Sequence, residues 1–187
     1  MNALAAIAAA RSVGVPAAQS VKLLTTFRNV KRRMEVKGSV DGVTVYDDFT
    51  HHPTAIDTTI AGLRTRIGDA SNSCILAVLE SRSNTMKLGT MKAQLPSSLA
   101  NADLVFGYGA REGRDKLGWD LADALSPLGA KAQAFNEIEP LVKAVTAAAR
   151  PGDHVLVMSN GGFGGVHQKL LDALSARDAA STKKGTA

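Results

Sequence analysis

The sequence predicts a doubly wound α/β fold built on a mostly parallel sheet. Apolar strands alternate with amphipathic helices along most of the 187-residue chain. Several strands, such as Cys74–Glu80 and His154–Met158, are almost continuously apolar, which is typical of strands buried on both faces. Near the start, Asp41-Gly42 joins two strands and supplies the positive φ of a tight hairpin. These observations favour a parallel sheet between two layers of helices, with an N-terminal hairpin strand.

The individual elements follow from apolar spacing and from helix-breaking residues. The alanine-rich start repeats apolar residues every three or four positions until Gly14-Val15-Pro16, which predicts a helix. A second amphipathic helix is expected over 17–27. The predicted strands are 34–40, 43–48, 74–80, 104–108, 131–135 and 154–158, and the helices between and after them are 53–67, 86–99, 119–125, 138–149 and 167–174. The polar segment 175–187 is expected to be disordered.

Composition limits the functional classes. The net charge is +5, yet the one tight basic cluster, Lys31-Arg32-Arg33, lacks interleaved aromatics, and aromatics make up 4% of the chain. Solvated surface charge is therefore favoured over nucleic-acid binding, although the cluster could receive the phosphates of a mononucleotide. The single cysteine, Cys74, rules out a disulfide framework and favours a reducing, cytoplasmic compartment, with the thiol buried in a strand. No apolar stretch reaches the roughly 20 residues of a membrane span, and no basic segment precedes the apolar start, so neither a membrane partner nor a signal peptide is expected.

The segment Tyr46–Ile56 carries the densest polar chemistry. Two carboxylates and two imidazoles lie where an apolar strand gives way to a helix opened by Pro53. In open α/β sheets the carboxyl ends of strands face the ligand crevice, and a helix N-terminus there favours anions. This junction predicts a site for a nucleotide or an anionic substrate. Alternatively, Asp47 and Asp48 simply cap the helix.

A glycine-rich loop, 159–165, follows the last apolar strand and opens the last helix. Four of its seven residues are glycine, which permits close backbone approach to a ligand and exposes N–H groups to anions. It matches no dinucleotide fingerprint, and the chain contains no Gly-x-x-x-x-Gly-Lys-Ser/Thr phosphate loop. The tightest phosphate contacts are therefore not encoded in this chain.

A third polar loop, Glu80–Thr85, follows the strand that begins near Cys74. Arg82, flanked by hydroxyls and an amide, suits bidentate recognition of a carboxylate. The alternative is a surface loop that caps the next helix through Ser83 or Thr85. Because all three loops follow parallel strands, Asp48, Arg82 and Asn160 are expected at one edge of the sheet.

The four histidines of the chain do not predict a metal site. Adjacent His51 and His52 point in different directions and have few further ligands nearby, so zinc is not expected. His154 and His167 are expected at a strand start and on a helix surface.

Taken together, these motifs resemble one enzyme family. Asp-Asp-Phe-Thr-His-His-Pro-Thr, from Asp47, resembles the strand-to-helix motif that opens the C-terminal domain of the Mur ligases, the ATP-dependent amide-forming enzymes of peptidoglycan synthesis. Arg32-Arg33-Met34-Glu35 and the residues before it are similar to the end of that family's central ATPase domain. The arginine and glycine loops are most similar to members that recycle a murein tripeptide.

The resemblance implies a domain organisation and a set of partners. Residues 1–34 would be a helical remnant of the ATPase domain, 35–176 a Rossmann-like C-terminal domain and 177–187 a tail, with the true chain continuing upstream. The implied reaction joins UDP-N-acetylmuramate to the tripeptide L-Ala-γ-D-Glu-meso-diaminopimelate through an acyl phosphate. ATP and Mg²⁺ would be held mainly by the missing N-terminal and central domains, so the fragment alone is expected to be inactive. The resemblance also implies roles for individual residues: catalysis for His51 and Asp48; ATP binding for Asn2, Arg33 and Asp48; and peptide binding for His52, Arg82, Ser83, Asn84, Thr85, Asn160, Gly161 and Gly162.

Three alternatives stay open at this point. The nearest is the UDP-N-acetylmuramate–L-alanine ligase C-terminal domain of the same family. A non-catalytic module that binds muropeptides or nucleotides is the second, and a basic nucleic-acid binder, whose DNA affinity would fall steeply with salt, is the third.

Overall fold

The computed structural model describes residues 2–28, 30–68 and 72–184. The chain divides into two units, Met1–Lys31 and Arg32–Ala187; we expected the division after residue 34. The first unit consists of helices α1 (Asn2–Ser12) and α2 (Ala17–Leu24), which contact each other. Gly14, with φ of +92°, lies in the turn between them, where the sequence predicted the first helix to stop.

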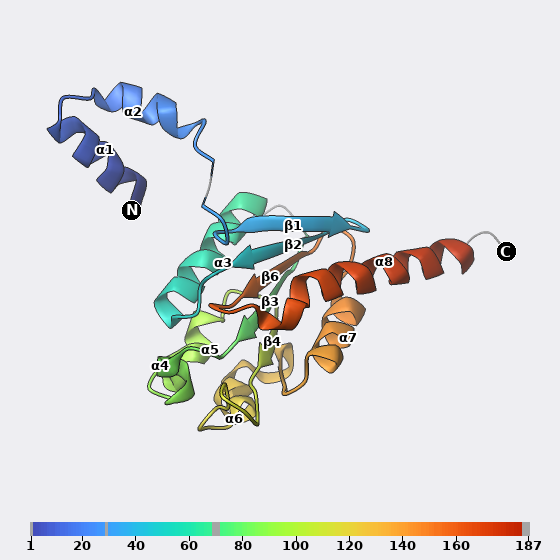
Figure 1. Cartoon of the computed structure of the whole chain (residues 1–187). Helices are drawn as coiled ribbons and strands as arrows, with labels where there is room; N and C mark the ends of the chain where they lie inside the picture. The colour runs from blue at the N-terminus through green and yellow to red at the C-terminus, as the bar shows by residue number, and fades with distance from the viewer. Residues whose placement is uncertain (1, 29, 69–71, 185–187) are drawn as a thin grey trace. The chain divides into compact units, whose positions relative to one another are not determined.

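The second unit contains the predicted sheet (Figure 1). Six strands lie in the order β1-β2-β6-β3-β4-β5, and every neighbouring pair is parallel except β1 and β2. The fold class predicted from the sequence is therefore confirmed. The strands are β1 (Glu35–Val40), β2 (Val43–Asp48), β3 (Ile75–Glu80), β4 (Leu104–Tyr108), β5 (Ala132–Phe135) and β6 (His154–Met158).

Helices cover both faces of the sheet and divide the core into two layers. Along β3, Ile75, Ala77 and Leu79 pack with one set of helices, and the alternate residues Leu76 and Val78 pack with the other. This alternation explains the continuous apolar runs, because both faces of a central strand are buried. The first set is α3 (Pro53–Ile67), α5 (Leu95–Ser98) and α6 (Leu121–Leu125), and the second is α7 (Ile138–Ala148) and α8 (Val166–Lys184).

The hairpin between β1 and β2 forms as expected. Asp41 and Gly42 both have positive φ, +50° and +71°. Two successive positive φ values match the twist of the flanking strands and make a tight antiparallel connection.

The helix expected over 86–99 is instead three short pieces. These are α4 (Asn84–Lys87), a 3-10 turn over Lys92–Gln94, and α5. Gly89 interrupts the first turn with φ of +74°. The ring of Trp119 lies so close to Gly89 that an added Cβ would be 2.9 Å from the indole Cδ1. A tertiary contact therefore overrides the helical pattern.

The last helix is longer than predicted. We expected it to end at Leu174 and the tail 177–187 to be disordered, but α8 continues to Lys184. Arg177 anchors the extension by donating to Thr146 O and Ala149 O, both at 2.6 Å, and by pairing with Asp41 at 3.1 Å. The expectation of disorder is therefore wrong for 177–184, and 185–187 lie outside the described residues.

Candidate functional site

Three polar loops meet at one edge of the sheet. Strand β6 lies between β2 and β3 and is parallel to both, with Met158 opposite Asp48 on one side and Leu79 on the other. The loops that carry Asp48, Asn160 and Arg82 therefore leave three neighbouring strands at the same end. This confirms the arrangement that the sequence predicted, at the position where ligands bind in open α/β sheets.

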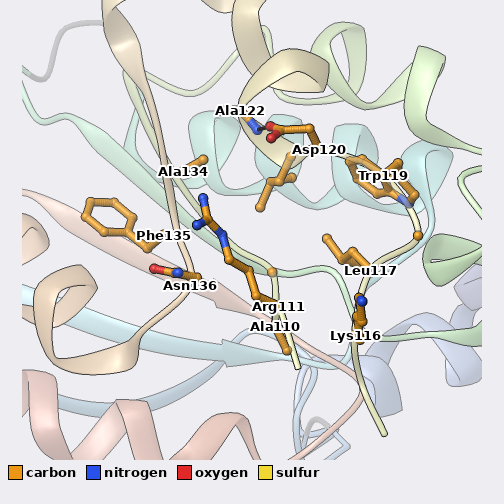
Figure 2. Close-up of a pocket in the computed structure, with 13 residues that line it drawn as sticks. Ala110, Arg111, Lys116, Leu117, Trp119, Asp120, Ala122, Ala134, Phe135 and Asn136 are labelled. Carbon is orange, nitrogen blue, oxygen red and sulfur yellow. Dashed lines mark hydrogen bonds between the residues drawn. The ribbon is translucent and has the colours of Figure 1, made fainter. Parts of the chain in front are cut away.

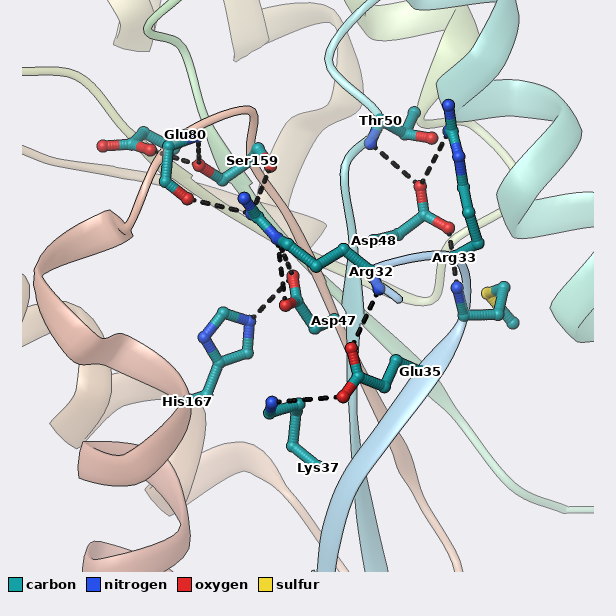
Figure 3. A network of polar contacts seen from close by, with 12 residues as sticks. Arg32, Arg33, Glu35, Lys37, Asp47, Asp48, Thr50, Glu80, Ser159 and His167 are labelled. Carbon is teal, nitrogen blue, oxygen red and sulfur yellow. Dashed lines mark hydrogen bonds and ion pairs between the residues drawn. The ribbon is translucent and has the colours of Figure 1, made fainter. Parts of the chain in front are cut away.

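Arg32 connects the end of β2 to the glycine loop (Figure 3). Its Nε lies 3.1 Å from Asp47 Oδ2, and its Nη2 donates to Ser159 O at 2.7 Å and to Gly161 O at 2.9 Å. The residue adopts a left-handed φ of +58°. The sequence interpretation selected Arg33 and gave Arg32 no individual role. No pattern in the sequence indicates which arginine turns inward, since that depends on the backbone conformation.

Asp48 is buried and holds the backbone on both sides of it. Its side chain is 3% exposed, and its two oxygens accept hydrogen bonds from Thr50 N at 2.8 Å and Met34 N at 2.9 Å. Arg33 Nη1 lies 3.8 Å from Asp48 Oδ1, while the Arg33 side chain is 54% exposed. Asp48 does not cap α3: the N-cap residue is His52, and no side chain caps that helix. Arg33 and Asp48, both expected to bind ATP, thus lie close together.

His167 belongs to this network, contrary to the expectation of a helix-surface residue. Its Nε2 lies 3.2 Å from Asp47 Oδ1, and its side chain is 14% exposed. Burial lowers the pKa of His167, although the Asp47 carboxylate opposes the change. The lowered pKa favours the neutral imidazole near pH 7, and Nε2, although close to Asp47, has no hydrogen-bond partner among the described residues. In the sequence, only the position of His167 two residues after the glycine loop indicated that it could lie at this site.

Ser159 joins the glycine loop to the other two loops. Its Oγ donates to the Glu80 carboxylate at the end of β3 and accepts from Gly161 N at 2.9 Å. Its own N–H donates to Asp48 O at 3.0 Å. Burial raises the pKa of Glu80, and the hydrogen bond from Ser159 partly offsets that increase. The Gly161 N–H, expected to face a ligand, thus has an internal partner.

Arg82 lies against the glycine loop. Its Nε is 3.0 Å from Asp115 Oδ2, and a Cβ added at Gly161 would lie 1.8 Å from its Nη1. Ser83 caps α4 by accepting from Met86 N at 3.2 Å, which was the alternative considered for this loop. Asn84 and Thr85 are exposed. Glycine at 161 is therefore needed for the close approach of Arg82.

The other predicted site residues differ from one another in burial and in hydrogen bonding. Asn160 Oδ1 is buried and has no hydrogen-bond partner among the residues that the structure describes. His51 Nδ1 lies 3.1 Å from Phe49 O, and His52 is exposed at the start of α3. Gly162 has a right-handed φ of −82°. Asn2 begins α1 in the first unit.

The described part of the chain contains neither a cluster of metal ligands nor a membrane-spanning helix. Within 2–28, 30–68 and 72–184, no three His, Cys, Asp or Glu side chains gather in a way that could hold a metal ion. No helix within those ranges combines the length and apolar character that a bilayer crossing requires.

Comparison with known proteins identifies the family. The family described as Mur ligase, glutamate ligase domain, matches residues 32–161. The chain belongs to the Mur ligases. The matched range contains β1 to β6, the loops after β2 and β3, and the start of the glycine loop, so the resemblance to the C-terminal Mur ligase domain is confirmed.

Individual Mur ligases match over almost the whole chain. A UDP-N-acetylmuramate–L-alanyl-γ-D-glutamyl-meso-2,6-diaminoheptandioate ligase of Escherichia coli is 48% identical over 94% of this chain and 37% of its own length. A UDP-N-acetylmuramate–L-alanine ligase of Streptomyces avermitilis is 34% identical over 93% of this chain and 38% of its own. The crystal structure of a murein peptide ligase from Psychrobacter arcticus matches with a TM-score of 0.70 and 38% identity, covering 93% of this chain and 36% of that one. The chain thus spans little more than a third of these relatives.

Proposed function

We propose that this chain is the amino-substrate-binding part of an ATP-dependent ligase that joins UDP-N-acetylmuramate to L-alanyl-γ-D-glutamyl-meso-diaminopimelate. The observation that carries the proposal is the packing of Arg82 against Gly161, which joins the arginine loop to the glycine loop. The greater identity to the tripeptide ligase, 48% against 34% for the alanine ligase, favours the peptide as amino component.

The chemistry of this edge suits a peptide that carries carboxylates. Asp115 occupies only Arg82 Nε among the described contacts, which leaves the terminal nitrogens for a bidentate carboxylate contact. Asn160 Oδ1 is a buried acceptor without a partner, and a peptide N–H would satisfy it. Further polar contacts to the peptide would come from Ser83, Asn84, Thr85 and His52. Because Gly161 and Gly162 have no side chains, the peptide could approach the backbone of the glycine loop closely.

The nucleotide role rests on Arg33 and Asp48. The exposed Arg33 guanidinium can reach the phosphates of ATP, and Asp48, whose oxygens accept backbone hydrogen bonds, would orient it. Asn2 would lie near the nucleotide, as its match to the family implies. Among the described residues no three metal-ligating side chains gather, and we assign Mg²⁺ mainly to the rest of the ligase, as the resemblance implies.

This chain would act mainly by positioning. Holding the peptide amine against the activated carboxylate of the other substrate converts the encounter into an intramolecular step. His51 would contact the reacting groups, and closure of the domain would exclude water that could hydrolyse the activated carboxylate. The dependence on ATP and the single cysteine fit a cytoplasmic enzyme.

The acceptor comparison tests this function. With the complete ligase, ATP and UDP-N-acetylmuramate, the tripeptide should support ADP release and product formation much faster than free L-alanine. A preference for free L-alanine would favour the alanine ligase instead. If neither acceptor reacts, calorimetry with the tripeptide would decide whether the chain is a non-catalytic binding module.

A further inference from the structure

The glycine loop has neighbours on both sides along the edge of the sheet. On one side, beyond the carboxyl ends of β4 and β5, lies a cavity of about 360 Å³ that Arg111 helps to line and to which the sequence interpretation gave no role (Figure 2). On the other side, toward β1 and β2, lies a group of charged and titratable side chains (Figure 3). This group, the charge cluster, consists of Arg32, Glu35, Lys37, Asp47 and His167.

Within the charge cluster, Arg32 fixes the backbone on both sides of Asn160. Its Nη2 donates to Ser159 O at 2.7 Å and to Gly161 O at 2.9 Å, which are the carbonyls before and after Asn160. Two hydrogen bonds from one nitrogen restrict the φ and ψ angles of Asn160, and therefore the direction of its side chain. Because Asn160 Oδ1 is buried and lacks a partner in the described part of the chain, that direction decides whether a peptide N–H can reach it.

Asp47 in turn holds the guanidinium of Arg32. Arg32 Nε lies 3.1 Å from Asp47 Oδ2 and 3.3 Å from Oδ1. The backbone of Asp47 is fixed in the sheet, where β2 pairs with β6 and Asp47 lies opposite Val157. A carboxylate on a rigid strand thus determines where Arg32 lies.

His167 is the one group of this cluster that changes charge close to neutral pH. Its Nε2 lies 3.2 Å from Asp47 Oδ1 but makes no hydrogen bond to any residue that the structure describes. Burial lowers the pKa of His167, and the positive charges of Lys37 and Arg32 lower it further, against the opposing effect of Asp47. Glu35 accepts from Arg32 N at 2.8 Å and pairs with Lys37 at 3.4 Å. With a neutral imidazole, the two cations of the cluster therefore face two carboxylates.

We propose that Arg32 positions Asn160 for the peptide and that protonation of His167 below neutral pH weakens this positioning. The inference rests on the proposed function and adds a control of the same site. An imidazolium would form an ion pair with Asp47 and repel Arg32, so the two cations would compete for one carboxylate. Arg32 would then hold the two loop carbonyls less firmly, and the glycine loop would bind the peptide more weakly. Arg32, Asp47 and His167 are positioning residues in this account.

The test follows the KM for the tripeptide with pH in three forms of the complete ligase, with ATP and UDP-N-acetylmuramate saturating. These are the wild type, His167→Gln and His154→Gln. Glutamine is polar and does not take up a proton in this range. His154 is the matched control, because burial lowers its pKa too, but it begins β6, at the end of the strand away from the glycine loop. Titration of His51, His52 and the substrates is common to all three proteins and cancels when they are compared.

Near pH 7.5 the three proteins should have similar KM values for the tripeptide, because His167 is then neutral. Near pH 5.5 the KM of the wild type and of His154→Gln should exceed that of His167→Gln about fivefold or more, the lower end of typical coupling between two sites. Thermal unfolding should show all three proteins folded at both pH values. A ratio of wild-type to His167→Gln KM that does not change with pH would overturn the control by His167, since a purely structural residue would shift KM alike at each pH.

Arg32→Lys tests the positioning of Asn160 separately. Lysine keeps the positive charge beside Asp47 but lacks the fork that serves the carboxylate and both carbonyls at once. Near neutral pH this variant should be folded and should have a raised KM for the tripeptide and an unchanged KM for UDP-N-acetylmuramate. A folded variant with the wild-type KM for the tripeptide would contradict the role of Arg32. If the wild-type ligase uses no peptide at all, the proposed function itself is wrong, and this inference with it.

Discussion

Arg82 packs directly against the backbone of Gly161, so that a Cβ added at position 161 would lie 1.8 Å from Arg82 Nη1. Two loops that are almost 80 positions apart in the sequence thus share one contact. A larger residue at position 161 would not preserve this contact, and neither would an arginine at another position of the loop. The arginine loop and the glycine loop therefore form one surface.

This contact predicts the effect of Gly161→Ala. The methyl group should displace the Arg82 guanidinium and raise the KM for the tripeptide roughly tenfold, the equivalent of about 1.4 kcal/mol, in the complete ligase. Gly62→Ala is the control, because Gly62 lies at an exposed position of α3, outside the proposed site, and no atom lies within 4 Å of an added Cβ. Equal kinetics for the two variants would show that the contact does not set peptide affinity.

Arg32 should be important for stability. Arg32→Ala removes the ion pair of Asp47, a buried carboxylate, and the hydrogen bonds to the glycine loop. Breaking a buried pair costs about 3–5 kcal/mol, and because Arg32 is 25% exposed we expect about 2–3 kcal/mol. Urea denaturation measures the loss. Arg66→Ala, at an exposed position of α3, should change the free energy of unfolding by less than about 0.5 kcal/mol. Similar losses in both variants would contradict the role of Arg32.

The pH dependence of stability should reflect His167. Burial lowers the pKa of this histidine in the folded state, so at acid pH the unfolded chain binds more protons than the folded one. Its neutral form supports folding fully above the unfolded pKa of about 6.5, and this contribution is lost as the pH falls below that value. His154 should act in the same direction, since burial lowers its pKa as well.

The measurement is the free energy of unfolding between pH 7.5 and about 5 for wild type and His167→Gln. The variant should lose less stability over this interval than the wild type, because it no longer takes up a proton on unfolding. Parallel curves would mean that His167 titrates alike in the folded and unfolded states. Glu80 acts in the opposite sense through its raised pKa, and the comparison of the two proteins cancels that effect.

The strands and the placement of the three loops could be predicted from the sequence because local patterns determine them. The strand ends at Asp48, Tyr108 and Met158 match the apolar runs, and Asp41-Gly42 has the conformation that the dipeptide favours. Parallel pairing then places the loops at one edge without further information.

The missed features depend on contacts between distant residues. His167 is 120 positions from Asp47, and no helical pattern reports that pairing. The cavity at Arg111 lies on an irregular loop whose shape is fixed by tertiary contacts such as Trp119 to Met86. Likewise, the extension of α8 depends on Arg177 reaching the end of α7. Patterns in a single sequence do not carry such information.

The most direct test of the account is the effect of Arg82→Ala on the two Michaelis constants of the complete ligase. If the arginine and glycine loops hold the amino component, the KM for the tripeptide should rise roughly tenfold or more, in line with one lost charge-assisted contact, while the KM for ATP stays within about twofold. An equal rise in both constants, or a rise in the KM for ATP alone, would contradict the assignment of this edge of the sheet to the peptide.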